Sequence, residues 1–141
     1  NATGNKALGI LKGYGITGGA VAQTIAHDSH NLICIGDNDE DMYQAIREIE
    51  KMGGGQAIVS KGEILAEMPL PIGGIMSDLS VVETAENQKK MFEAAKNLGI
   101  NEDVAPFMTL GFMSLAVIPE VKLTDKGLID TLHFKEIPLF E

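Results

Sequence analysis

The chain is poor in cysteine and in basic residues, and it lacks any long apolar run. Its single cysteine, Cys34, cannot form a disulfide within the chain, and a free thiol inside an apolar run favours a reducing compartment, so we expect a cytoplasmic protein. Lysine and arginine total 11 against 20 acidic residues, and the net charge of −9 argues against a nucleic-acid partner or an anionic membrane surface. No apolar run approaches the roughly 20 residues that a membrane-spanning helix needs.

The length of 141 residues and the apolar content of 45% indicate a folded chain with its own core. We expect a single domain over residues 3–141. Asn1-Ala2 is typical of the remnant of a cleaved purification tag, and no initiator Met precedes Thr3. This start favours a domain cut from a larger protein, although a processed subunit would also begin in this way.

Two segments carry helical periodicity together with capping residues. In residues 38–55, apolar side chains recur on one helical face, Asn38 is placed as the N-cap, and three consecutive glycines end the helix. In residues 80–99, Ser80 and Glu83 have the spacing of a capping box, and Gly99 is placed as the C-cap. The apolar face predicted for this second helix consists of Val82, Ala85, Phe92, Ala95 and Leu98.

Apolar runs and glycine turns predict short strands and two hairpins. Residues 32–35 are typical of a buried strand, residues 56–68 of a hairpin turning at Lys61-Gly62, and residues 120–130 of a second hairpin. The apolar stretch 107–117 has no periodicity that decides between helix and strand. The expected fold class is α+β (mixed α/β layers): one sheet built of hairpins and short strands, packed by two main helices.

The segment "GYGITGG" contains a G-x-G-x-x-G pattern at Gly13, Gly15 and Gly18, and Asp37 follows later in the chain. With a strand before the glycines and a helix after them, this would be a dinucleotide-binding unit whose backbone N–H groups approach a pyrophosphate. The residues after Gly18 fit a strand equally well, and the chain has 16 glycines. A nucleotide-binding domain through these three glycines is therefore a remote alternative to glycine-rich turns.

The segment "IAHDSHNLICIG" concentrates polar groups in one short stretch. Two of the three histidines, His27 and His30, stand three residues apart, with Asp28 and Ser29 between them and Asn31 next. A nucleophile relay through Ser29 is disfavoured because adjacent side chains rarely point at each other. A turn in which Asp, Ser and Asn side chains cap backbone N–H groups would have the same composition.

A metal site would need at least one further ligand. Histidines three residues apart on a helix supply two, and Asp28, Asp37, His133 or a group from another chain would supply the third. His133 lies in "DTLHFKEIPLF", which is typical of a strand near the end of the chain, and we interpret it as structural. The residues alone leave open a metal or substrate contact and a structural turn.

Several segments together resemble one known family. They are "LGILKGYGITGGAVAQTIAHDSHN", "GDNDEDM", "MGGG", "MPLPIGGIMSD" and "PFMTLGFMSLAVIPEVKLTDKGLID", in this order from about Thr3 to beyond Asp130. They closely resemble the C-terminal region of the bacterial and archaeal adenine deaminases, which belong to the amidohydrolase superfamily. The resemblance covers nearly the whole chain, and "GYGITGG" is part of it.

The resemblance implies a hydrolase that converts adenine and water to hypoxanthine and ammonia. In that family a divalent metal centre (Mn, Fe or Zn) activates the water, and its ligands lie in a (β/α)8 barrel. This chain has no His-x-His motif and is too short for such a barrel. We therefore expect a C-terminal domain without the metal-binding barrel, inactive by itself. Its expected partners are the N-terminal barrel of the same protein, adenine as substrate of the full enzyme, and further copies in a homo-oligomer.

The resemblance leaves two roles for the domain. In the first, His27, Asp28, Ser29, His30 and Asn31 reach the barrel mouth, where they line the purine site or contact a metal or the groups around its ligands. In the second, the domain is a structural or oligomerisation module, and the histidines only shape a loop. The chain contains no complete catalytic set, and His27 and His30 are its weak candidates for metal ligands.

Overall fold

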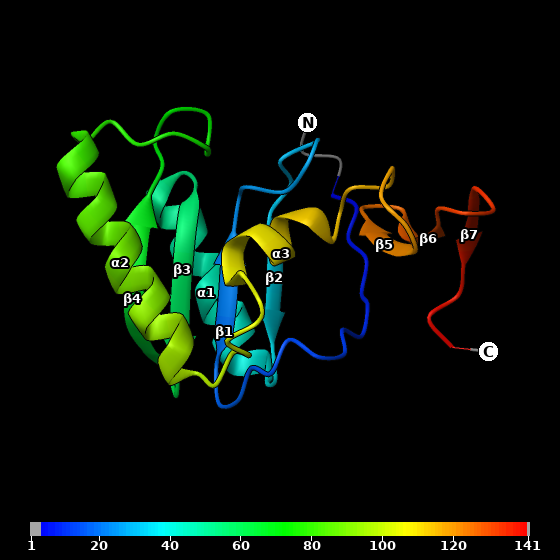
Figure 1. Ribbon diagram of the computed structural model, residues 1–141, viewed down its shortest axis with the longest axis horizontal. Coiled ribbons are helices and arrows are strands. Elements are labelled where there is room, and N and C mark those ends of the chain that lie inside the picture. Colours follow the sequence, from blue (N-terminus) through cyan, green and yellow to red (C-terminus); the bar gives the residue numbers. More distant parts are fainter. Residues whose placement is uncertain (1–3, 141) are drawn as a thin grey trace.

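A four-stranded antiparallel sheet lies at the centre of the structure, with helices on both faces (Figure 1). The computed structural model describes residues 4–140, so Asn1-Ala2, interpreted above as a tag remnant, lies outside the described part. The strands are β1 (Ala20–Gln23), β2 (Ile33–Gly36), β3 (Gly55–Ser60) and β4 (Glu63–Pro69). Their order is β2-β1-β3-β4, and the hairpin predicted at Lys61-Gly62 joins β3 to β4.

Three helices cover this sheet: α1 (Asp39–Met52), α2 (Val81–Asn97) and α3 (Pro106–Phe112). The side chains of β1 and β3 alternate between the two faces, as the period of two requires. Val21 and Ile58 are completely buried in the cluster that includes residues of α2 and α3. Ala20, Ala22 and the other small residues of the opposite face pack against α1. The core is therefore divided into two layers by the sheet.

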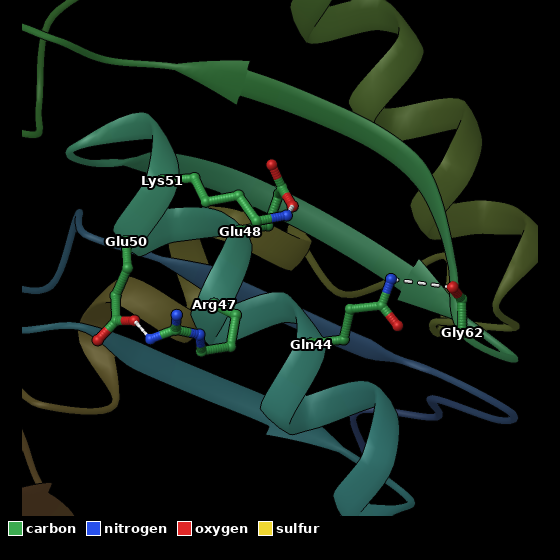
Figure 2. A network of polar contacts seen from close by, with 6 residues as sticks. All are labelled: Gln44, Arg47, Glu48, Glu50, Lys51 and Gly62. Carbon is green, nitrogen blue, oxygen red and sulfur yellow. Dashed lines mark hydrogen bonds and ion pairs between the residues drawn. The ribbon is translucent and has the colours of Figure 1, made fainter.

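Helix α1 begins and ends where its capping residues predict. The Asn38 side chain accepts a hydrogen bond from the Asp41 N–H at 2.9 Å, and Gly53 adopts the left-handed conformation that ends the helix. Its outer surface is polar: Arg47 pairs with Glu50, and the Gln44 amide donates to the Gly62 carbonyl at 2.9 Å (Figure 2). This surface is compatible with solvent.

The capping box of α2 is confirmed, and the predicted apolar face is confirmed only at Ala95 and Leu98, which are buried. Ser80 and Glu83 exchange both hydrogen bonds of the box, and the C-cap is Leu98, one residue before the predicted Gly99. Val82 and Phe92 are 68% and 48% exposed. Helix α2 contacts β4 and β3, and its half-buried or buried residues, together with the C-cap, are Thr84, Asn87, Gln88, Met91, Ala94, Ala95 and Leu98. The first half of α2 therefore has half-buried polar residues, while Val81 and Val82 are exposed.

A second, three-stranded antiparallel sheet lies apart from the first (Figure 1). Its strands are β5 (Val121–Thr124), β6 (Gly127–Asp130) and β7 (Lys135–Ile137). The α+β class and the hairpin at residues 120–130 are confirmed, whereas the expected single sheet is wrong. The stretch 107–117, whose periodicity did not decide between helix and strand, contributes most of α3. The Leu123 N–H of β5 donates to the carbonyl of Met113, the C-cap of α3, at 2.9 Å, and this bond connects the second sheet to that helix. In residues 4–140 no helix is long and apolar enough to cross a membrane.

The glycine pattern does not form a nucleotide-binding unit. Strand β1 follows Gly18 where such a unit would require a helix. The Asp37 carboxylate accepts hydrogen bonds from the N–H groups of Gly18 at 2.6 Å and Gly19 at 3.0 Å. Hydrogen bonds from Gly18, the Asn38 amide and Gly19 lower the pKa of Asp37. The chain's own carboxylate therefore occupies the place where the motif would bind a phosphate, and the remote alternative is wrong.

Asp41 ties the start of α1 to the β3–β4 turn. Its buried carboxylate accepts hydrogen bonds from the N–H groups of Lys61 at 3.0 Å and Gly62 at 2.8 Å, and from the Asn38 amide at 2.9 Å. Burial tends to raise the pKa of Asp41, but these hydrogen bonds outweigh it and the pKa is lowered. The folded state thus favours the charged carboxylate more than the unfolded state does.

We predict that Asp41→Asn lowers the free energy of unfolding at pH 7, because an amide offers one acceptor oxygen to two backbone N–H groups. For a lowered pKa the contribution is complete above the unfolded value of about 3.9 and is lost as the pH falls through the folded value. Urea unfolding at pH 7 and at progressively lower pH should therefore show the difference from the parent chain shrinking on acidification. Asp39→Asn, in the same exposed first turn, is the control; equal stability of the two variants at pH 7 would contradict this account.

Candidate functional site

The residues singled out in the sequence lie on the loop that joins β1 to β2, residues 24–32, which we name the histidine loop. It forms a tight turn: the His30 N–H donates to the Ala26 carbonyl at 2.6 Å, and the Ala26 N–H donates to His30 Nδ1 at 3.3 Å. His30 has a φ of +52°, in the left-handed region. The two histidines therefore do not lie on a helix, although a helix is what two metal ligands three residues apart would require.

Helix α3 and the residues just after it hold the histidine loop in place. The His27 N–H donates to the Gly111 carbonyl at 3.0 Å, and the Ser114 hydroxyl donates to the His27 carbonyl at 2.9 Å. The imidazole of His27 stacks on Phe112 with ring centroids 5.1 Å apart. Both backbone groups of His27 are thus satisfied by a segment more than 80 residues away in the chain.

The buried side-chain amides of Gln23 and Gln56 support the start of the histidine loop. Gln23 on β1 is completely buried, and its Nε2 donates to the carbonyls of Ile25 at 2.6 Å and Phe107 at 2.9 Å. Its Oε1 accepts from Gln56 Nε2 on β3 at 3.1 Å. Sequence reasoning missed Gln23, although a polar residue on the apolar face of a strand is a signal for such a contact.

The polar side chains of the histidine loop differ in burial. The rings of His27 and His30 are half-buried and meet edge to face at 5.5 Å, while Asp28, Ser29 and Asn31 are exposed. Because His30 Nδ1 accepts a hydrogen bond, the neutral ring carries its proton on Nε2. The loop therefore offers a ring N–H donor, a carboxylate, a hydroxyl and a carboxamide within five consecutive residues, a set able to bind a heterocycle that has both donors and acceptors.

Two of the candidate third metal ligands, Asp37 and His133, are engaged elsewhere, while Asp28 is exposed on the histidine loop itself. Asp37 binds the glycine turn, and His133 Nδ1 lies 2.7 Å from Asp130 Oδ2 in a turn before β7, where the sequence favoured a strand. Within the described residues 4–140, no group of three histidine, cysteine, aspartate or glutamate side chains is placed to hold a metal ion. The histidine loop does not fit a self-contained metal centre.

Comparison with known proteins identifies relatives over the whole chain. The sequence model of the adenine deaminase C-terminal domain family matches residues 1–135. "Adenine deaminase 2" of Carboxydothermus hydrogenoformans is 48% identical over 139 residues, which are 99% of this chain and 24% of that protein. The adenine deaminase of Nitratidesulfovibrio vulgaris (strain DP4) is 52% identical over 134 residues, 94% of this chain and 23% of that protein. The chain thus spans about a quarter of the length of these relatives.

The hydrogen bonds assign opposite tautomers to two histidines. We predict the Nε2–H form for the neutral ring of His30, because Nδ1 accepts from Ala26, and the Nδ1–H form for His133, because that nitrogen faces a carboxylate. Long-range proton–nitrogen correlation NMR distinguishes the two forms, and His133 serves as the internal control. An Nδ1–H form for His30 would show that the turn at Ala26 is not closed by its ring.

Proposed function

The chain belongs to the family of adenine deaminase C-terminal domains, and we propose that its histidine loop completes or shapes the purine site of a full-length adenine deaminase. Support comes from the coverage of the chain by such relatives and from the concentration of exposed polar groups on one loop held by α3. The observation that carries the proposal is this rigid presentation of both histidines, since binding groups need a fixed scaffold to act on a substrate.

The proposed activity of the whole enzyme is hydrolysis of adenine to hypoxanthine and ammonia. The divalent metal, Mn, Fe or Zn, would be held by an amidohydrolase barrel in the N-terminal part of the same protein, since the residues of the histidine loop do not fit a metal centre. We propose a reducing compartment, the cytoplasm, for the enzyme. Cys34 supports this as a free thiol whose pKa burial raises to about 12.

The chemistry of adenine matches the groups on the loop. A purine offers ring nitrogens as acceptors, and its amino group and ring N–H as donors. The Nε2–H of His30 would donate to a ring nitrogen, and the exposed carboxylate of Asp28 would accept from a donor. Ser29 and Asn31 can do either. These contacts would orient the base, while the bond-breaking chemistry is assigned to the N-terminal part.

One observation favours the alternative, a structural or oligomerisation module. The His30 ring closes the turn at Ala26, and the His27 ring packs on Phe112, so both side chains already serve the loop itself. If that were their whole role, the domain would act through its surfaces, on the barrel or on another copy. The two roles differ in what His30→Asn does, because the Asn side-chain oxygen can replace the Nδ1 acceptor but supplies no Nε2–H.

We predict that His30→Asn and His27→Ala in the full-length enzyme lower kcat/KM by about 10²-fold or more, a magnitude typical of a bound substrate held out of its reacting position. Steady-state kinetics with adenine measure the effect, together with the yield of folded protein and the oligomeric state. His133→Asn is the matched control, since His133 lies in the second sheet and contacts Asp130. Full activity in the folded His30→Asn and His27→Ala enzymes would leave only the structural role.

We further predict that the 141-residue chain alone does not release ammonia from adenine, with or without added Mn²⁺, Fe²⁺ or Zn²⁺. The physical reason is that activating water at neutral pH requires a metal site with protein ligands, which we assign to the N-terminal part. Ammonia release is the measurement, with a full-length relative as the positive control. Turnover by the purified chain would locate the chemistry in this domain and overturn the assignment.

A further inference from the structure

The segment that links β4 to α2 lies at the same end of the central sheet as the histidine loop. The Thr24 hydroxyl donates to the Gly74 carbonyl at 2.5 Å, and the Leu70 N–H donates to the Gly54 carbonyl at 3.0 Å. The backbones of Gly54 and Gly74 approach so closely that a Cβ on Gly54 would lie 2.5 Å from the Gly74 Cα. Both segments reach the upper edge of the molecule in Figure 1. The two loops are therefore fixed relative to each other.

This linking segment and the first turn of α2 expose an apolar surface, which we name the 72–82 patch. Met76 is 54% exposed and Val81 is 86% exposed. Asp78 is the one charged residue between positions 72 and 82. The patch consists of Ile72, Ile75, Met76, Leu79, Val81 and Val82.

Backbone hydrogen bonds fix the conformation of the segment that carries the 72–82 patch. The N–H and carbonyl groups of Ile72 and Met76 exchange hydrogen bonds at 3.2 Å, and the Ile75 N–H donates to the Ile72 carbonyl at 3.3 Å. In the first turns of α2, Thr84 and Asn87 are half-buried, whereas Val81 and Val82 are exposed. An ordered surface of this composition keeps apolar area in water until a partner covers it, and it loses little conformational freedom on binding.

The face of the domain that α1 covers differs from the 72–82 patch in polarity. The outer side of α1 carries the Lys51–Glu48 ion pair at 2.6 Å, together with the other polar contacts drawn in Figure 2. Such a surface is stable in water and has no need of a cover. The apolar residues of the 72–82 patch therefore lie on a different part of the surface from the ion pairs of α1.

The geometry points to the N-terminal part of the full-length enzyme as the partner that covers the 72–82 patch, and this inference rests on the proposed function. The relatives have about three quarters of their length outside the region that this chain matches, so a large partner is joined to the domain by the chain itself. The patch is continuous with the histidine loop through Thr24 and Gly74. A partner seated on the patch would therefore meet the histidine loop at its edge, which is where the proposed function needs the purine.

The test is photo-crosslinking in the full-length enzyme with p-benzoylphenylalanine in place of Met76 and, in a second variant, of Val81. Tyr43, which is 67% exposed on α1, carries the same probe as the matched control. All three positions are exposed, so the probe does not have to fit into the core. After irradiation, gel mobility separates adducts within one chain from adducts between chains, and peptide mapping identifies the segment reached.

We expect the probes at positions 76 and 81 to form adducts with peptides of the N-terminal part, and the probe at position 43 to form none. An adduct between position 76 and the same domain of a second subunit would overturn the inference and make the patch an interface between copies. Adduct formation at 76 and 81 no greater than at 43 would also overturn it, because the patch would then be uncovered.

This experiment is independent of the kinetics of the histidine variants. If the patch crosslinks to the N-terminal part while His27→Ala and His30→Asn remain fully active, the docking surface stands and the role in the purine site fails. If the histidine variants are inactive but position 76 crosslinks to another copy, the purine-site role stands and the docking surface fails.

Discussion

Helix α3 and the histidine loop are joined by hydrogen bonds between groups that are largely buried away from water. Gln23 Nε2 donates to Phe107, the His27 N–H donates to Gly111, and Ser114 donates back to His27. In a low-dielectric interior such bonds are strong, and a lost partner leaves a desolvated polar group. The position of His27 thus depends on a segment far along the chain, and the turn that His30 closes at Ala26 adjoins it.

The surface of the domain differs in polarity from one region to another. The outer side of α1 is ion-paired and suited to solvent, whereas the end of the sheet combines the polar histidine loop with the 72–82 patch. The hydrogen bond between Thr24 and Gly74 holds these two parts together. An exposed apolar surface beside the polar histidine loop is compatible with the proposed docking of this domain on another part of the same protein.

Local features could be predicted from the sequence and long-range ones could not. The caps at Asn38 and at Ser80 with Glu83 were predictable because each is formed by residues within one helical turn. The buried face of α2 was predicted correctly at Ala95 and Leu98 but not at Val82 and Phe92, because packing on β4 overrides their apolar signal and leaves them exposed. The histidine cluster was visible as composition, but its support by Gln23, Phe112 and Ser114 links residues up to 87 positions apart. The separation of β5–β7 into a second sheet likewise depends on tertiary pairing.

The central claim, that the histidine loop faces the purine, is tested most directly by a structure of the full-length enzyme with adenine or hypoxanthine bound. The account predicts that His30 Nε2 or an oxygen of Asp28 lies within hydrogen-bond distance of the base, about 2.7–3.2 Å, with α3 holding the loop as it does here. A base enclosed entirely by the N-terminal part, with residues 27–31 facing solvent or another subunit, would contradict it.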